Sequence, residues 1–278
     1  MQKQPNVREL KKKAVEIRKD ILTMLQRAGS GHTGGSLSLV EIFVALYFYK
    51  ARHNPKNPAW QERDKIILSK GHGCPALYAV LAAVGYFPRE ELWTLRKLGS
   101  RLQGHPQLGL PGVEISSGSL GQGLSVANGM ALANKMDGIK SKVYCIMGDG
   151  ETNEGQVWEA AMTAAHYKLD NVCGIIDFNK MQIDGLCCEV KGLEPFAKKW
   201  QGFGWNTKEV DGHNFEQLTC ALDEADKVRG KPQVIIAHTI KGKGISFIEN
   251  QVKWHGIAPK KEELTKALKE LDDQLKVL

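Results

Sequence analysis

The sequence predicts an α/β fold in which a parallel sheet carries helices on both faces. Short apolar stretches rich in β-branched residues alternate with longer stretches of helical periodicity, and this alternation is typical of such a sheet. The chain has 278 residues, of which 42% are hydrophobic and 25% charged, as in an ordinary globular domain. No linker divides it. We therefore expect one domain over residues 1–278.

The expected elements follow one another along the chain. Strands are expected at Ile66–Leu68, Val143–Met147, Val172–Ile176 and Gln233–His238. Helices are expected at 6–28 with a stop at Gly29, at Ser36–Tyr49, from about Pro75, at Leu120–Met136, from about Gly155, and as an amphipathic C-terminal helix over about 259–278. The stretch Leu98–Ser119 is rich in Gly, Pro and Ser and is too long for a plain connection, so we interpret it as a functional loop.

Charge and cysteine usage exclude several function classes. The net charge of +7 is modest, and acidic residues interrupt the basic run at 11–19, which favours a solvated helix face over a nucleic-acid surface. The six cysteines form no CxxC pair, which is typical of free thiols in a reducing cytoplasm. No stretch approaches the ~20 apolar residues of a membrane span. We expect a cytoplasmic protein that binds neither nucleic acid nor membranes, and whose basic character suits anionic ligands such as sugar phosphates.

The triplet Gly148-Asp149-Gly150 carries the most functional information. It follows one strand candidate, and Asn179 follows the next, with 28 residues between Gly150 and Asn179. This is the spacing of a strand–helix–strand unit, so both side chains would reach the same edge of the sheet. Asp149 and Asn179 offer the hard oxygens that Mg²⁺ prefers, and the glycines let a phosphate approach a helix N-terminus. A lone GDG is most often a turn, but the ordered set predicts the metal-bridged diphosphate site of a thiamine diphosphate enzyme.

Five of the eight histidines lie in turns next to glycine: His32, His72, His105, His213 and His255. A single loop histidine is usually an ordinary surface residue. Turns at the carboxyl ends of parallel strands nevertheless converge on one crevice. Imidazoles there could hold a diphosphate, donate to a developing alkoxide or move protons between hydroxyls. His213 is the expected outsider, because Asp211-Gly212 indicates a plain turn before a helix.

Six sequence blocks resemble, in the same order, the N-terminal diphosphate-binding half of transketolase. They are SGHTGGSLS (30–38), LSKGHGCPALY (68–78), GHPQLGLPGVEISSGSLGQGLSVANGMAL (104–132), GDGETNEGQVWEA (148–160), DFNKMQIDG (177–185) and KWHGIAP (253–259). The form of SSGSLGQG and KGKGISFIENQVKWHG resembles the split transketolases, in which two separate chains make the enzyme. The resemblance covers nearly the whole domain and implies the thiamine-diphosphate-binding fold known as the PP domain.

The resemblance implies a cofactor role for each matching residue. Mg²⁺, for which Ca²⁺ or Mn²⁺ could substitute, would be bound by the side chains of Asp149 and Asn179 and by the carbonyl of Met181. The other implied contacts are with thiamine diphosphate itself. Those to the diphosphate would come from His72, Gly150 and His255, and those to the thiazolium ring from Leu120 and Ile183.

The donor ketose would lie against His32, His105 and His255, which would contact its hydroxyls and steady the charge on its carbonyl oxygen. Glu154 is similar in position to an acid at the subunit interface that links the two cofactor sites; alternatively, it is a helix-start glutamate favoured by the helix dipole. Two positions depart from the family pattern. Phe178 stands where an acid or Asn is usual, and Ser119 where long-chain transketolases have Pro. Neither change removes a charge that the chemistry needs.

The resemblance also implies a missing half. The glutamate and the aromatic residue that activate the cofactor's aminopyrimidine belong to the pyrimidine-binding domain, and no segment of this chain matches that domain. We therefore expect a second subunit carrying it, an α₂β₂ assembly, and no catalysis by this chain alone. The small-residue helix near 120–136 and the leucines of the C-terminal helix are candidate subunit contacts.

The implied activity is reversible transfer of a two-carbon ketol unit from a ketose phosphate to an aldose phosphate. One alternative is half of another thiamine diphosphate carboligase acting on a different sugar, against which the GHPQLGLPGVE and KWHG blocks argue. Another is a catalytically idle regulatory homologue, which could have discarded the metal ligands and histidines kept here. A generic nucleotide-binding domain is excluded, because the sequence has neither GxGxxG after its first strand nor GxxxxGK[ST].

Overall fold

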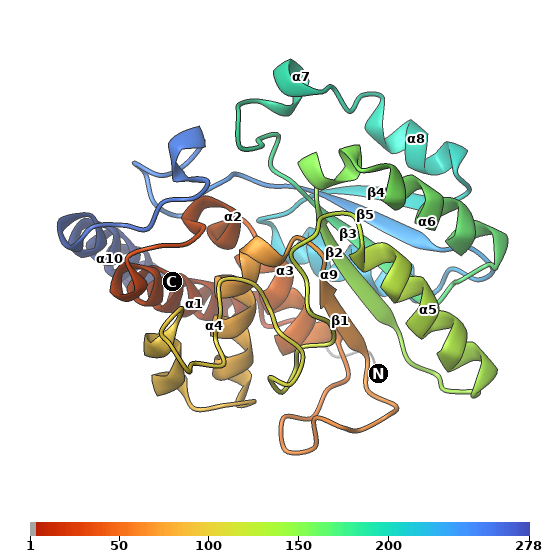
Figure 1. Ribbon diagram of the computed structural model, residues 1–278, viewed down its shortest axis with the longest axis horizontal. Coiled ribbons are helices and arrows are strands. Elements are labelled where there is room, and N and C mark those ends of the chain that lie inside the picture. The colour runs from red at the N-terminus through yellow and green to blue at the C-terminus, as the bar shows by residue number, and fades with distance from the viewer. Residues whose placement is uncertain (1–3) are drawn as a thin grey trace.

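A five-stranded parallel sheet forms the centre of the computed structural model, which describes residues 4–278 (Figure 1). The strands are β1 (Lys65–Leu68), β2 (Val143–Gly148), β3 (Val172–Phe178), β4 (Asn206–Asp211) and β5 (Gln233–His238). Their order in the sheet is β1-β2-β3-β5-β4, and every neighbouring pair is parallel. All residues of β2 and β3 are buried, as expected for central strands covered on both faces.

Helices cover both faces of this sheet, as predicted. The longer ones are α1 (Val7–Ala28), α4 (Cys74–Val84), α5 (Gly123–Met136), α6 (Gly155–His166), α9 (Phe215–Ala225) and α10 (Lys261–Lys276). Shorter ones are α2 (Thr33–Leu37), α3 (Val40–Ala45), α7 (Cys187–Val190) and α8 (Phe196–Gly202). Short segments of other helix types lie at η1 (Leu46–Lys50), η2 (Gly71–Gly73), η3 (Arg89–Thr94), η4 (Gly150–Asn153) and η5 (Val252–Trp254).

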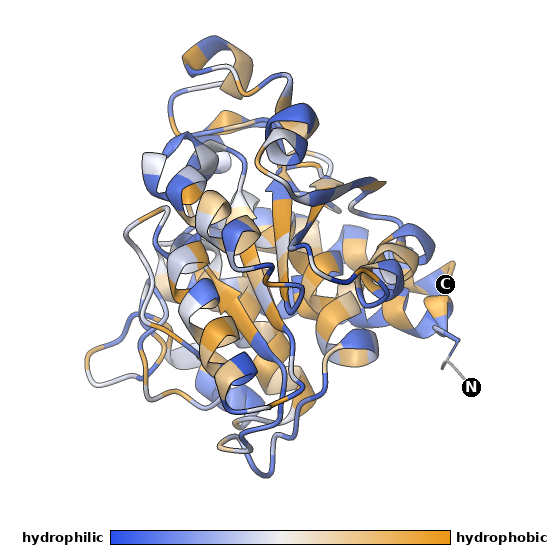
Figure 2. Cartoon of the chain, turned by 90° about the vertical axis from the view of Figure 1, so that its right-hand side faces the viewer, coloured by the Kyte–Doolittle hydropathy of each residue, from blue (hydrophilic) through white to orange (hydrophobic). Residues whose placement is uncertain are grey.

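Alternate strand residues divide the interior into two apolar layers. On one face, Ile66, Ile146 and Ile175 pack in the same core as α1, α3, α4, α9 and α10. On the other face, Met147 and Ile176 pack with α5, α6 and α8. Figure 2 shows largely hydrophobic strands surrounded by helices in which hydrophobic and hydrophilic residues alternate. This arrangement leaves the carboxyl ends of the strands free to carry polar loops.

Two expected helices differ from the structure, and one strand was not predicted. The helix predicted over Ser36–Tyr49 is three consecutive pieces, α2, α3 and η1. The first break falls at Ser38. Its hydroxyl donates to Gly35 O and to the Asp177 carboxylate, and such side-chain bonds compete with regular helix. The helix predicted from Leu120 begins at Gly123, because Gly121 adopts φ 86°, outside the helical region. Strand β4 was not predicted: its sequence NTKEVD is polar and mostly exposed at the sheet edge.

The C-terminal helix forms as predicted, but its leucines do not make a free surface. Leu271 is fully buried, and Leu264 and Leu275 pack against the same core as α1. The apolar stripe of α10 is therefore used largely within the chain, and contact of its half-buried leucines with another subunit stays a prediction. Over residues 4–278, no helix combines the length and apolar character needed to cross a membrane.

A buried ion pair joins α1 to α3. The Arg18 guanidinium donates to both Glu41 oxygens, at 2.6 and 2.8 Å, and His213 Nδ1 lies 2.9 Å from Glu41 Oε2. Burial by itself would raise the pKa of Glu41, but Arg18 and His213 outweigh it and lower that pKa to about 2. At pH values above 4.5, the ordinary pKa of the group, the ionised Glu41 therefore stabilises the fold. This contribution is lost as the pH falls toward 2.

We expect Glu41→Gln to lower the free energy of unfolding by about 3 kcal/mol at pH 7, because it leaves the buried Arg18 charge unpaired. Urea unfolding of the chain should show this difference shrinking as the pH is lowered from 5 toward 2. Glu16→Gln is the matched control, since Glu16 pairs with Lys13 on the surface and should change stability by less than about 0.5 kcal/mol. Equal effects of the two variants at pH 7 would contradict the prediction.

Candidate functional site

A cavity of about 500 Å³ opens at the carboxyl ends of the strands. Its walls come from the segments that follow β1, β2, β3 and β5, together with the loop before α5 and the start of α2. This is the edge at which open parallel sheets bind ligands. The residues predicted for the site that line this cavity are His32, His72, His105, Leu120, Asp149, Gly150, Glu154, Asn179, Met181, Ile183 and His255. The sequence-based site therefore gathers in one place.

A larger hollow, of about 760 Å³, lies at the opposite end of the strands. It is rich in lysine and arginine, but most of these charges already have carboxylate partners. Lys50 pairs with Asp223 and Asp226 at 2.6 Å each, and Lys135 pairs with Asp170 at 2.8 Å. We therefore take the smaller cavity as the functional site.

Four of the five turn histidines meet in the cavity. The ring of His32 lies 5.2 Å from that of His72, 5.7 Å from that of His255 and 6.3 Å from that of His105, measured between centroids. The rings of His72 and His255 are 5.4 Å apart. His213 lies elsewhere, as expected, and its Nε2 accepts a hydrogen bond from the Ile240 N–H.

The environment keeps these imidazoles uncharged at neutral pH. Burial, followed by the charge of Lys70, lowers the pKa of His72 to about 2. Burial and Lys241 lower the pKa of His255 to about 3, and burial and Arg96 lower that of His32 to about 4. Burial and Arg96 also lower the pKa of His105. The cluster therefore presents neutral rings, each with one donor and one acceptor nitrogen.

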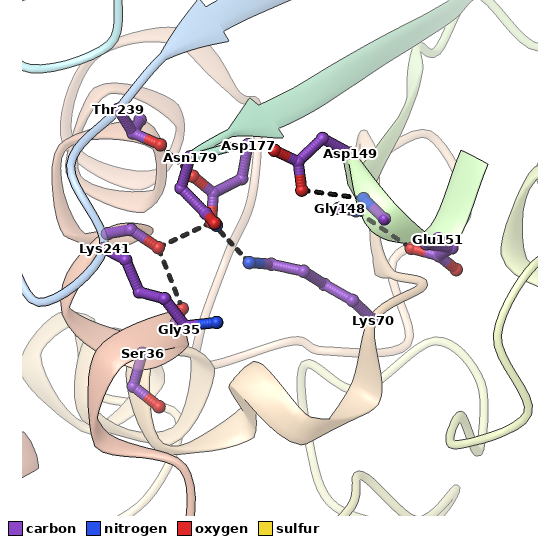
Figure 3. A network of polar contacts seen from close by, with 12 residues as sticks. Gly35, Ser36, Lys70, Gly148, Asp149, Glu151, Asp177, Asn179, Thr239 and Lys241 are labelled. Carbon is purple, nitrogen blue, oxygen red and sulfur yellow. Dashed lines mark hydrogen bonds and ion pairs between the residues drawn. The ribbon is translucent and has the colours of Figure 1, made fainter. Parts of the chain in front are cut away.

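The predicted metal ligands lie together at the ends of β2 and β3 (Figure 3). The Asp149 carboxylate accepts hydrogen bonds from the N–H groups of Gly150, at 2.7 Å, and Lys180. Asn179 Oδ1 accepts from the Met181 N–H at 3.2 Å. Burial raises the pKa of Asp149 to about 6, so a bound cation would offset an unfavourable buried charge.

The donor set decides which cation fits. Among residues 4–278, no group of three or more His, Cys, Asp or Glu side chains is arranged to hold a metal. The site offers instead one carboxylate, one amide oxygen and one carbonyl, all hard oxygens. Such a set suits Mg²⁺, which usually binds through one or two carboxylates and completes its shell with phosphate oxygens and water.

Unpaired polar atoms in the cavity fit an acceptor-rich ligand. His32 Nδ1, Asn153 Nδ2 and Gln182 Nε2 are buried and have no hydrogen-bond partner, and all three residues line the cavity. Buried amide nitrogens without acceptors are unfavourable and rare. Phosphate oxygens and sugar hydroxyls would supply the missing acceptors, so the residues present fit a diphosphate-bearing cofactor and its substrate.

Sequence reasoning missed a buried ion pair beneath the site. The Lys70 ammonium contacts the Asp177 carboxylate, and both side chains are at most 2% exposed. Asp177 also accepts from the hydroxyls of Ser38, at 2.6 Å, and Thr239, and from Asn179 Nδ2 at 3.2 Å (Figure 3). Burial alone would raise the pKa of Asp177, but these partners, Lys70 above all, lower it. The pair thus fixes the amide of Asn179.

Lys241 is a second residue that sequence reasoning missed, and it lines the cavity near the predicted metal ligand Met181. Its Nζ donates to His255 Nδ1 at 2.7 Å and lies 3.5 Å from the Met181 carbonyl. Because Nδ1 of the neutral His255 accepts this bond, its proton sits on Nε2, which is then a donor. Burial and the charge of Lys70 lower the pKa of Lys241 to about 8. An anionic ligand would favour its charged form.

Glu151 connects the loop before α5 to the end of β2. Its buried carboxylate accepts from the Ser69 hydroxyl, from the Gly121 N–H at 2.9 Å and from the Gly148 N–H at 3.0 Å. The contact with Gly121 holds the neighbouring Leu120, which is 36% exposed, on one wall of the cavity; Ile183, 68% exposed, also lines the cavity. The only local signal for Glu151 was its place after the GDG triplet.

The remaining predictions concern Glu154 and the two residues that depart from the family pattern, Phe178 and Ser119. Glu154 is exposed at the N-terminus of α6, on the rim of the cavity, and is compatible with either role considered for it. Phe178 points away from the site: its ring stacks on that of Phe196 at 5.2 Å and meets that of His238 edge-on. The aromatic residue therefore packs under α8 and leaves the predicted ligand Asn179 in the cavity. Ser119 is exposed.

Comparisons with known proteins agree with this site. Residues 10–273 match the family model described as transketolase, thiamine diphosphate binding domain. The chain is 46% identical over 267 residues to the 6-deoxy-6-sulfo-D-fructose transketolase subunit SqwG of Clostridium sp. (strain MSTE9), covering 96% of this chain and 97% of that protein. It is 42% identical to one subunit of the apulose-4-phosphate transketolase of Phocaeicola vulgatus, with 98% and 97% covered.

A solved structure shows the same architecture. The transketolase of Campylobacter jejuni superposes with a TM-score of 0.91 at 35% identity, over 96% of this chain. That match covers 43% of the Campylobacter chain, so the present chain spans less than half of a single-chain transketolase. The chain belongs to the transketolase family and corresponds to its thiamine diphosphate-binding domain.

Proposed function

We propose that this chain is the diphosphate-binding and metal-binding subunit of a two-chain transketolase. The observation that carries the proposal is the convergence of Asp149, Asn179 and four neutral histidines on one cavity at the sheet edge. Three relatives that it covers over 97% of their length are named as transketolase subunits. The reaction would be reversible transfer of a two-carbon ketol unit from a ketose phosphate to an aldose phosphate.

Each residue would have a defined part in binding. Asp149, Asn179 and the Met181 carbonyl would hold Mg²⁺, with Ca²⁺ or Mn²⁺ as substitutes. The diphosphate would lie against the metal. It would also accept hydrogen bonds from His72, Lys241 and the Gly150 N–H. The Gly150 N–H bonds to the Asp149 carboxylate in the absence of ligand. Phosphate binding would exchange that contact as Asp149 turns to the metal.

The sugar would occupy the other side of the cavity. Thiamine diphosphate, when bound, would supply the electron sink for breaking and forming the carbon–carbon bond. His32 and His105 would donate to sugar hydroxyls, and the Nε2 proton of His255 is free to reach the carbonyl oxygen of the donor. Leu120 and Ile183 would flank the thiazolium ring and exclude water. Glu154, on the rim, would face the neighbouring subunit.

The pyrimidine-binding part of the site would come from a second subunit, in an α₂β₂ assembly. Relatives that the chain covers over nearly their whole length are named as transketolase subunits, which supports a partner of this kind. The α5 helix leaves apolar Val126 and Met136 exposed, which supports the small-residue helix as a subunit contact. We also propose that the enzyme works in the cytoplasm, where the six unpaired cysteines would stay reduced.

The first test is ketol transfer with and without the partner chain, in the presence of Mg²⁺ and thiamine diphosphate. We expect no measurable turnover by this chain alone, because it supplies only part of the cofactor site, and turnover when both chains are present. Donors should include xylulose 5-phosphate, apulose 4-phosphate and 6-deoxy-6-sulfofructose, because the relatives are named for the latter two sugars.

Three outcomes would overturn parts of the proposal. Ketol transfer by the purified chain alone would exclude the need for a second subunit. Cofactor binding by the complex without turnover on any of these donors would favour a different carboligase, and absence of cofactor binding would favour a regulatory homologue. Calorimetric titration of thiamine diphosphate with Mg²⁺ into the complex separates the last two.

A further inference from the structure

Arg96 adopts an uncommon backbone conformation beside the cavity. Its φ is 60°, in the left-handed region that non-glycine residues seldom occupy. The turn is held closed by the Arg96 N–H, which donates to Leu102 O at 2.8 Å, and by a contact of 2.7 Å between the hydroxyls of Thr94 and Ser100. A conformation of this kind persists only where the surroundings fix it, and it aims the side chain in one direction.

The guanidinium of Arg96 bridges two segments of the site. It lies flat against the backbone of Gly104, where an added Cβ would come within 2.6 Å of its terminal nitrogen. Its other terminal nitrogen donates to Ser30 Oγ at 3.4 Å. Within residues 4–278, the arginines that form ion pairs with carboxylates do not include Arg96. The side chain therefore has contacts that fix its place, but its charge is not neutralised.

Both bridged segments carry a histidine of the cavity. Ser30 precedes His32 by two residues, and Gly104 directly precedes His105. These are the two rings of the cluster that lie farthest apart among the measured pairs, at 6.3 Å between centroids. The His105 backbone is further held by its carbonyl, which accepts from the Tyr78 hydroxyl at 3.2 Å.

We propose that Arg96 is a positioning residue for the donor sugar, which sets the separation of His32 and His105 and surrounds both rings with positive charge. This inference rests on the proposed transketolase function and deepens it, because it adds a residue outside the cavity wall on which substrate recognition depends. Arg96 does not touch the reacting atoms. It acts through the two histidines.

The charge has a second consequence, for protonation. The charged and titratable groups facing His32 are Arg96, Lys241, His72, His105 and His255, and those facing His105 are Arg96 and His32. None of them is anionic, so nothing stabilises an imidazolium there. With burial, Arg96 is the leading cause that keeps both histidines neutral and able to accept as well as donate a hydrogen bond.

Three variants separate position from charge. Arg96→Met removes both the contacts and the charge. Arg96→Lys keeps the charge but loses the planar guanidinium that contacts both segments. Gly104→Ala displaces the guanidinium and leaves its charge unaltered. Arg101→Met is the matched control, because Arg101 lies in the same loop but pairs with Glu91 on the surface, at 2.8 Å. Thermal unfolding of each variant establishes that the chain remains folded.

The first readout is steady-state kinetics of the two-chain enzyme. We expect Arg96→Met to lower kcat/KM for the donor ketose by roughly tenfold to a hundredfold, mostly through KM, because misplaced substrate contacts have effects of this size. Arg96→Lys and Gly104→Ala should share most of this loss, and Arg101→Met should stay within about twofold of the unaltered enzyme.

The second readout is titration of the histidine ring protons of the full chain by NMR, which needs neither partner nor turnover. In Arg96→Met, the pKa of His32 should rise from about 4 toward its ordinary value of 6.5. Arg96→Lys should leave it nearly unchanged. The proposal is overturned if Arg96→Met leaves both kcat/KM and the titration as they were, or if Arg101→Met reproduces its effects. If the unaltered complex shows no ketol transfer, the proposed function fails, while the titration still decides whether Arg96 acts on the histidines.

Discussion

Replacement of Asp149 by alanine is expected to abolish ketol transfer by the two-chain enzyme, lowering kcat by on the order of a thousandfold. Asp149 supplies the only carboxylate among the three proposed metal ligands. Without it, Asn179 and the Met181 carbonyl are two neutral oxygens, too few to hold Mg²⁺ against water. The diphosphate would then lose the cation that bridges it to the protein.

The loss should not come from unfolding. Burial raises the pKa of Asp149 from 3.8 to about 6, so the folded apoprotein binds this proton more tightly than the unfolded chain does. The stabilising contribution of the protonated form is therefore present at low pH and is lost as the pH rises through about 6. At pH 7 the ionised carboxylate is unfavourable in the apoprotein. Asp149→Asn, which has no such charge, should unfold at an equal or higher temperature than the unaltered apoprotein.

Two measurements test this prediction together. Calorimetry should detect no Mg²⁺-dependent binding of thiamine diphosphate to the Asp149→Ala complex at concentrations that saturate the unaltered one. Asp137→Ala, at the far end of α5, is the control and should bind and turn over normally. Retention of most of the activity by Asp149→Ala would exclude this residue as a metal ligand.

The sequence predicted those parts of the fold that have a strong local pattern. The four strands that were predicted are apolar runs, and each ends at the cavity edge with a polar or glycine-rich turn. The edge strand β4 has no such run, because most of its residues are exposed to water and are polar. The helix expected at Ser36–Tyr49 was broken by a contact that no local pattern reports, the bond from Ser38 to Asp177, 139 residues away.

The site was predicted to the same degree and for the same reason. Asp149, Asn179 and His72 lie in turns directly after a strand, and the other three histidines lie in glycine-adjacent turns that are equally visible in the sequence. Lys70, Lys241 and Arg96 also lie in turns, but their importance depends on which charges face them across the fold. The partner of Lys70 is 107 residues away along the chain. The guanidinium of Arg96 can occupy its position only because Gly104 has no side chain. Such pairings carry no periodicity and become apparent only when the strands are placed side by side.

Lys70→Met is expected to be the most damaging substitution for the fold itself, lowering the free energy of unfolding by about 3–5 kcal/mol. Asp177 has no exposed surface, and without the Lys70 ammonium its charge is left with only neutral donors. Urea unfolding of the chain at pH 7 measures the change. Lys12→Met, which breaks a surface pair with Glu9, should alter stability by less than about 0.5 kcal/mol.

A double substitution distinguishes the effect of the unpaired charge from that of a packing defect. Lys70→Met combined with Asp177→Asn removes both charges and keeps an amide that can bond to Ser38 and Thr239. If the uncompensated carboxylate is the cause, the double variant should be more stable than Lys70→Met alone, although it has one more change. If the double variant is less stable, the methionine itself disturbs the packing and the pair is not the stabilising element. Either variant should also weaken cofactor binding, because Asp177 holds the Asn179 amide, and a metal ligand whose orientation is not fixed binds its cation less tightly.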